Sequence, residues 1–183
     1  MKTFKIPFTQ GQAKNILSKD DFRPAMKGVF FDNTNGLFVL TNAHALSMIE
    51  IDMEEMFDTD FIIPIEALPT NKKDSEISDY TFEDGKIIKI GAVGSRSEFL
   101  PIDEKYPAYN SVIPSKNSSA EIPHISFNMG LIGSVSNFLK FVDPKNQISN
   151  FYFHGTNKAV KFKCKTSAYN VSGLIMPCLF EAN

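Results

Sequence analysis

The sequence has no tryptophan, only two cysteines and no long apolar run. Cys164 and Cys178 are too few for a disulfide framework, so we expect two free thiols in a reducing cytosol. No stretch reaches the roughly 18 apolar residues that a membrane-spanning helix needs. The N-terminus also lacks the apolar core of a signal peptide. Together these absences predict a cytoplasmic protein without a membrane span.

An excess of charge of one sign is also absent, because 19 basic residues face 21 acidic ones and the net charge is -2. Dedicated DNA-binding proteins are usually basic, since neutralising phosphates supplies much of their affinity. The charge therefore argues against tight, dedicated DNA binding. What the chain does have is 43% apolar residues, including 17 phenylalanines, within 183 residues. This predicts a phenylalanine-rich core in one substantial domain or in one and a half small ones.

Residue patterns of common catalytic and metal sites are missing as well. We find no serine nucleophile with a partnered base and no phosphate-binding loop. His44 is the residue best suited to act as a base or ligand, but no Asp, Cys or second His lies at ligand spacing, and His124 and His154 are distant. The acidic residues between 52 and 58 lack the spacing of a calcium loop, which favours a solvated face. We therefore predict a structural or pocket-lining role for His44, no enzyme activity, no metal and no cofactor.

Hydrophobic periodicity and turn residues predict three copies of one pattern, a strand, a helix and three further strands. The first copy is predicted at 2–8 (strand), 10–18 (helix capped by Thr9), 26–31, 37–40 and 46–51 (strands). The second is predicted at 60–63 (strand), 65–68 (helix cut short by Pro69), 80–83, 86–90 and 95–102 (strands), with a loop at 72–75. The third is predicted at 121–127 (strand), 128–142 (helix capped by Asn128), 147–154, 158–164 and 172–179 (strands).

These copies predict an α+β fold of antiparallel sheets with helices on one face. We expect residues 1–115 to form a complete domain of two units, at about 1–58 and 59–105, followed by a linker. We expect residues 116–183 to form the third unit, half of a second domain. A half-domain has open edge strands and buries little surface. The third unit should therefore pack on the first domain or on another copy of the chain.

Three segments carry a resemblance to a known family. The first combines two strands, an acidic turn that ends in Gly36, and the sequence T-x-x-H-x-L at 41–46. The second is YPAYNSVIP at 106–114, and the third is LIMPCLF at 174–180. In order and spacing they resemble the bacterial sliding clamp, the processivity subunit (beta subunit of DNA polymerase III) of the replicative polymerase. The chain departs from that family where Asn42, Ala43, Ala45 and Leu179 replace aspartate, glycine and two arginines.

The resemblance implies a DNA-clamp-like fold that corresponds to the middle domain plus half of the C-terminal domain. It also implies a homo-oligomer, because the family's ring resembles a circle of twelve such units, which four chains of three units would fill. Weak, non-specific contact with duplex DNA would come from helix lysines that face the ring interior, namely Lys14, Lys72, Lys73 and Lys140. Ordinary solvated lysines are an equally good interpretation of each.

In the family, an apolar pocket between the second and third domains binds peptides of DNA polymerase and other partners. The resemblance implies that the pocket here consists of Met26, Thr41, Ala43, His44, Ala45, Leu46, Pro107, Ser111, Val112, Leu174, Met176, Pro177, Cys178 and Leu179. Such a lining is chemically suited to an apolar peptide, with Met176 as an adaptable wall. The alternative is that these residues only pack the junction between units.

The sequence thus predicts a sliding-clamp-like processivity or tethering factor that assembles on or around duplex DNA and binds partner proteins through a hydrophobic peptide pocket. The alternative is a stand-alone clamp-fold interaction module that does not encircle DNA. Topological retention on circular DNA separates the two, since only an encircling clamp is lost when the circle is cut.

Overall fold

The computed structural model describes residues 2–51, 53, 57–114, 125–145, 147–166 and 168–178. In this part of the chain the α-helices are α1 (Gln10–Ala13), α2 (Lys72–Ile77) and α3 (Met129–Leu139). Short 3-10 helices lie at Pro24–Lys27, Ile65–Ala67, Ala92–Gly94 and Tyr109–Val112. The strands are β1 (Val29–Asp32), β2 (Leu37–Thr41), β3 (Ala45–Glu50), β4 (Phe61–Ile63), β5 (Asp79–Glu83), β6 (Lys86–Ile90), β7 (Arg96–Phe99), β8 (Asn150–Tyr152), β9 (Val160–Lys165) and β10 (Asn170–Ile175). None of the helices in these ranges is long and apolar enough to cross a membrane.

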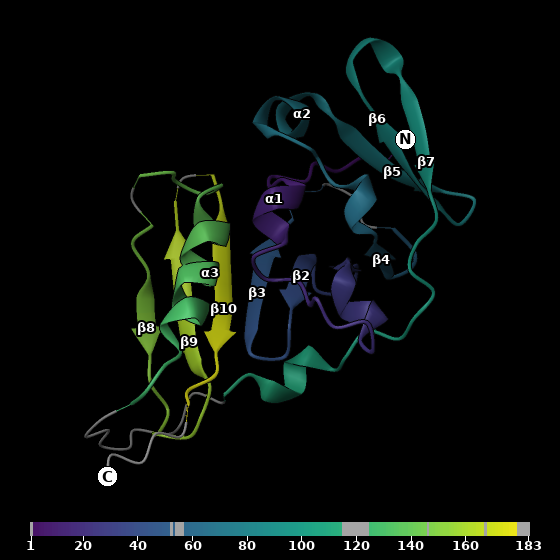
Figure 1. The fold of residues 1–183 in the computed structure, drawn as a ribbon. Helices are drawn as coiled ribbons and strands as arrows, with labels where there is room; N and C mark the ends of the chain where they lie inside the picture. The colour runs from purple at the N-terminus through teal and green to yellow at the C-terminus, as the bar shows by residue number, and fades with distance from the viewer. Residues whose placement is uncertain are drawn as a thin grey trace.

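Seven strands form one antiparallel sheet in the order β4-β1-β2-β3-β10-β9-β8 (Figure 1). The chain-order neighbours β1, β2 and β3 pair as predicted. β3 then pairs with β10 from the far end of the chain, so that Leu46 lies opposite Leu174 and Ala45 lies opposite Ile175. Strands of the first and third predicted units thus share one sheet within a single chain.

Gly173 lets β10 fit between its two neighbours. A Cβ atom at this position would lie 2.1 Å from the carbonyl oxygen of Leu46 and 2.4 Å from the ring of Phe162. Atoms of real side chains do not approach so closely, so only glycine can occupy the site without a shift of the backbone. The join between the first and third units therefore depends on this residue.

A second sheet has the order β5-β6-β7 and lies at the opposite end of the molecule from β8 (Figure 1). The predicted hairpin is confirmed as β5 and β6. Asp84 and Gly85 at its turn have φ angles of 49° and 74°, the positive values that a two-residue hairpin turn requires. One isolated bridge between Phe4 and Tyr80 ties this sheet to the N-terminal segment.

Helices α1 and α3 contact each other over one face of the large sheet (Figure 1). Phe8 lies between them and the sheet, with its ring centroid 5.5 Å from that of Phe138 and 5.9 Å from that of Phe38. Further along the same core, Phe31 stacks on Phe61 at 4.7 Å. All five rings are buried, which confirms the predicted phenylalanine-rich core.

The helix predicted at 128–142 is confirmed as α3, although it ends at Leu139. Asn128 is its cap, because the Asn128 Oδ1 accepts a hydrogen bond from the Gly130 N–H at 2.9 Å. The helix predicted at 10–18 is wrong in length, because α1 ends at Ala13. There the side chain of Asn15 donates to the carbonyls of Gly11 and Gln12, at 2.9 and 3.1 Å, and so replaces the next helical turn.

Two other local predictions are wrong. The loop predicted at 72–75 is the start of α2, because the Asn71 side chain caps the N–H of Asp74 at 3.0 Å. The strand predicted at 2–8 has no ladder in the described residues beyond the Phe4–Tyr80 bridge. Its alternation instead inserts Phe4, Ile6 and Phe8 into the core.

Several predicted strands are shorter than expected, notably β7, β8 and β10. The helix predicted at 65–68 is a single 3-10 turn, Ile65–Ala67, ahead of Pro69. Residues 121–124, with His124, lie outside the described residues, as do Asp52, Glu54 and Glu55. The division of the chain at residues 115–116 stays a prediction.

Candidate functional site

A cavity of about 220 Å³ opens where β3 meets β10. Its walls come from both strands, from the loop between β2 and β3, and from the segment that carries the 3-10 helix Tyr109–Val112. The lining residues are Met26, Thr41, Ala43, His44, Ala45, Leu46, Pro107, Ala108, Tyr109, Val112, Leu174 and Met176. The lining contains no Asp, Glu, Lys or Arg, so the cavity offers apolar contact rather than ion pairing.

The β2–β3 loop is held in place by its own side chains. The Asn42 Oδ1 accepts hydrogen bonds from the N–H groups of His44 (3.0 Å) and Ala45 (2.9 Å). The hydroxyl of Thr41 donates to the Ala45 carbonyl at 2.8 Å. Ala43 has a φ of 74°, the left-handed region that glycine adopts without strain. This loop therefore holds a fixed shape at the mouth of the cavity, with His44 exposed beside it.

The opposite wall is anchored by two tyrosines. Tyr106 stacks on Phe30 with ring centroids 4.5 Å apart, and its hydroxyl donates to the Val39 carbonyl at 3.2 Å. Tyr109 donates to the Asp32 carboxylate at 2.5 Å. Burial pushes the pKa of Asp32 up, but hydrogen bonds from Tyr109 and Asn35 outweigh burial and leave that pKa below its ordinary value. These contacts thus fix the wall to β1 and β2.

Most of the residues that the resemblance implied for the pocket lie around this one cavity: Met26, Thr41, Ala43, His44, Ala45, Leu46, Pro107, Val112, Leu174 and Met176. Ser111, Pro177 and Cys178 do not line it. Leu179 lies outside the described residues. Sequence reasoning missed Ala108 and Tyr109, although both stand in the YPAYNSVIP segment that it had singled out.

The four lysines suggested for DNA contact do not gather in one place. Lys72 and Lys140 line a groove of about 900 Å³ between α2 and the end of α3, whereas Lys14 lines a smaller concavity beside α1. Lys72 lies 3.7 Å from Glu76, and Lys140 donates to the Asn137 amide oxygen at 2.8 Å. Lys73 is exposed on α2 and lines neither hollow. This arrangement offers scattered cations rather than a continuous basic surface.

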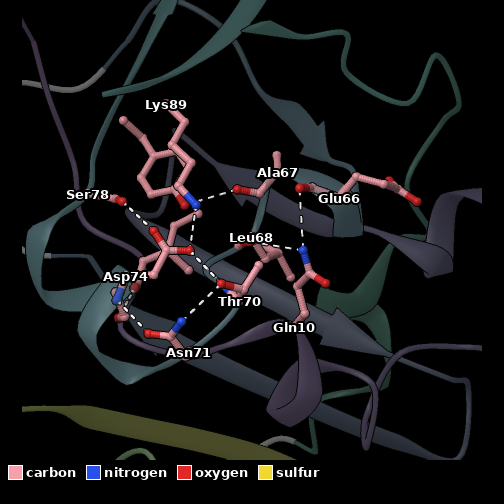
Figure 2. A network of polar contacts seen from close by, with 12 residues as sticks. Gln10, Glu66, Ala67, Leu68, Thr70, Asn71, Asp74, Ser78 and Lys89 are labelled. Atoms are coloured by element: carbon pink, nitrogen blue, oxygen red, sulfur yellow. Dashed lines mark hydrogen bonds and ion pairs between the residues drawn. The ribbon is translucent and has the colours of Figure 1, made fainter. Parts of the chain in front are cut away.

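A network of polar contacts lies around Asp74 (Figure 2). Its carboxylate accepts hydrogen bonds from the Lys89 ammonium, the Thr70 N–H and the Ser78 hydroxyl, each at 2.7 Å. Burial raises the pKa of Asp74, but the hydrogen bonds from Lys89 and Ser78 outweigh it and lower the pKa to about 2. The Asp74 carboxylate thus accepts hydrogen bonds from α2's own surroundings and from Lys89 of β6, so its role is structural: it joins α2 to β6.

No group of three or more His, Cys, Asp and Glu side chains that would hold a metal ion occurs in the part of the chain that the structure describes. Cys164 is buried and Cys178 is exposed, and both are free thiols. The apolar cavity at the β3–β10 join is therefore the strongest candidate site.

The sequence matches no model of a known protein family and no curated protein. Solved structures do match over nearly the whole chain. The DNA polymerase sliding clamp of Bacillus subtilis matches with a TM-score of 0.66 at 14% identity, over 98% of this chain and 64% of that one. The beta clamp of Helicobacter pylori in complex with diflunisal matches with a TM-score of 0.69 at 14% identity, over 98% of this chain and 66% of that one. The DNA polymerase III beta subunit of Thermotoga maritima matches with a TM-score of 0.67 at 10% identity, over 99% of this chain and 65% of that one.

These matches confirm the predicted sliding-clamp fold. At such low identity they show the fold alone. The chain spans about 65% of the length of the clamps that it matches.

Proposed function

We propose that this protein is a non-enzymatic, clamp-fold tethering factor that binds short apolar segments of partner proteins in the cavity between β3, β10 and residues 106–112. A polymerase subunit or another DNA-processing protein is the class of partner that the fold favours. The observation that carries the proposal is the apolar cavity itself, because it is preformed, lacks charged side chains and opens to solvent beside His44.

The size of the cavity supports a peptide over a cofactor. A cavity of about 150 Å³ is enough for benzene, and pockets for drug-sized ligands begin at roughly 300 Å³. At about 220 Å³ the cavity fits one or two apolar side chains. The remainder of a bound segment would lie over the exposed residues Met176 and Val112 at the rim. Methionine adapts to different side chains, which suits a site that serves several partners.

Assembly on or around duplex DNA is the second part of the proposal. The chain spans under two thirds of the B. subtilis clamp, so a closed ring requires more protein than one copy of this chain. The edge strand β8 carries the exposed rings of Phe151 and Tyr152, an open edge suited to another copy. We propose a cytoplasmic homo-oligomer that holds DNA by topology and weak contact.

A stand-alone interaction module that does not encircle DNA is the alternative. Two observations favour it: the net charge is -2, and the four candidate lysines are scattered over separate hollows. Retention on nicked circular DNA distinguishes the two. An encircling clamp stays on the circle and is released when the circle is linearised, whereas the module is not retained on either form.

The peptide site is tested by the fluorescence anisotropy of a labelled apolar peptide. We expect Met176→Ala to weaken binding about five- to tenfold, because it removes apolar contact that the bound peptide would cover at the rim. Leu46→Ala should weaken it as well, but Leu46 is buried in the sheet and its loss also destabilises the fold.

Met129→Ala is the matched control, since Met129 is 72% exposed at the start of α3 and lines none of the hollows described above. Equal binding by wild-type protein, Met176→Ala and Met129→Ala would place the peptide elsewhere and refute the cavity as the site.

A further inference from the structure

A second hollow adjoins the apolar cavity. It measures about 420 Å³ and lies between the end of α1, α3 and the β2–β3 loop. His44 lines both hollows. The 3-10 helix Pro24–Lys27 also connects them. Arg23 lines the second hollow and Met26 lines the apolar cavity, and the Arg23 carbonyl accepts a hydrogen bond from the Met26 N–H at 3.0 Å. One extended segment can therefore run from one hollow into the other.

The charge of this second hollow is positive, unlike that of the whole chain. Lys14, Lys19 and Arg23 line it, and Asp20 is its only acidic lining residue. Asp20 is already engaged, because its carboxylate lies 3.4 Å from the Arg23 Nε and accepts a hydrogen bond from the Phe22 N–H at 3.0 Å. Lys14 and Lys19 are exposed and have no acidic partner in the described ranges. Two cations are thus left for a ligand.

Resting on the function proposed above, we infer that the partner segment carries an acidic stretch next to its apolar anchor, and that this stretch lies past His44 over Lys14, Lys19 and Arg23. Carboxylates are the groups that clustered cations attract. Phe22 precedes Arg23 in the chain and is 95% exposed. Its ring adds apolar surface beside the charges, which the aliphatic parts of Asp and Glu side chains in such a segment can contact.

A peptide explains the hollow better than DNA does. Duplex DNA presents phosphates in a long, regular row, and its binding needs cations in a matching row. Lys72 and Lys140 lie in a different groove, so Lys14 and Lys19 are not part of such a row. The second hollow continues into a cavity without charged lining residues. A nucleic acid would gain nothing from that cavity, whereas a peptide with both apolar and acidic residues could fill both hollows.

The test uses three peptides with the same apolar anchor. One carries Asp and Glu before the anchor, one carries them after it, and one has Asn and Gln at all of these places. We expect one acidic peptide to bind about five- to tenfold more tightly than the neutral one at low salt, and the difference to shrink at high salt.

The variant Lys14→Glu/Lys19→Glu should abolish that difference and leave the neutral peptide's affinity unchanged. Lys72→Glu/Lys73→Glu is the control, because it changes the net charge equally at exposed positions outside this hollow. Circular dichroism verifies that both variants are folded.

The outcomes separate the two proposals. If no peptide binds, the proposed function fails. If all three bind equally and the Lys14→Glu/Lys19→Glu variant changes nothing, the cavity stands and the acidic-segment inference is overturned. If that variant loses affinity for duplex DNA but keeps its preference for the acidic peptide, the hollow is a phosphate-binding surface and the inference is again overturned.

Discussion

Gly173 is the single residue on which the join between β3 and β10 most depends. We expect Gly173→Ala to lower the free energy of unfolding by about 2 to 3 kcal/mol, because the new methyl group overlaps the Leu46 carbonyl and the Phe162 ring. Urea denaturation followed by circular dichroism measures the change.

Gly133→Ala is the comparison for this variant. Gly133 lies within α3, and a Cβ atom there meets nothing within 4 Å. Alanine should therefore stabilise the protein by about 0.5 to 1 kcal/mol through helix propensity. Equal stability of the Gly173→Ala variant and wild-type protein would show that β10 does not lie against β3 as described.

Ala43 shows how a departure from a family pattern can preserve geometry. The clamp pattern has glycine at this place, and Ala43 keeps the left-handed backbone that glycine would adopt, with a φ of 74°. Asn42 accepts the two loop hydrogen bonds through its side-chain oxygen, as an aspartate would. The resemblance therefore located the loop and its cavity although its sequence differs.

What the sequence could not supply at this scale is the charge of the neighbouring hollow. The sequence pattern marks Lys14 as one of four separate cations and gives no reason to single out Lys19 or Arg23. They meet Lys14 only because α1 ends at Ala13 and the following turns bring the 14–23 segment against α3. A helix continuing to residue 18, as the periodicity predicted, would have pointed these side chains differently.

At the scale of elements, the link between α2 and β6 through Asp74 is sensitive to acid. The folded pKa of Asp74, about 2, lies below its unfolded value of 3.8, so the ionised carboxylate stabilises the fold above about pH 4. That contribution is lost as the pH falls from about 4 to 2. We expect Asp74→Asn to reduce stability by about 1 to 2 kcal/mol at pH 7 and by much less at pH 2.

Denaturation of the wild-type protein and the variant across this pH range measures the effect. Asp103→Asn is a suitable control, because Asp103 is exposed and has no hydrogen bond or ion pair among the described residues. If the free energies of unfolding of the Asp74→Asn variant and wild-type protein differed by the same amount from pH 7 to pH 2, the assigned role of the carboxylate would be contradicted.

Elements with complete local signals were predictable. The β5–β6 hairpin has Asp84-Gly85 at its turn, and α3 has both a cap at Asn128 and helical spacing of apolar residues. α2 was missed because its sequence, KKDSEI, has almost no apolar periodicity. Its helix depends on the Asn71 cap and on contacts of Asp74 and Ser75 with distant segments, which a local pattern does not reveal.

At the scale of the whole molecule, the most consequential feature is the pairing of β3 with β10. Residues more than a hundred positions apart in the chain form this ladder, so no local pattern could have located it. It lets a third unit with open edges pack on the first, one of the two arrangements expected from the sequence. It also creates the cavity, whose walls come from both sides of that ladder and from residues 106–112.

Binding of the apolar peptide in the cavity between β3 and β10 can be observed by a methyl NMR titration of methionine-labelled protein. Met26 and Met176 line the cavity, whereas Met129 lies on α3 away from it. We predict that the Met26 and Met176 methyl signals shift in proportion to bound peptide and that the Met129 signal stays in place. Saturable binding with unchanged Met26 and Met176 signals would show that the peptide does not bind in this cavity.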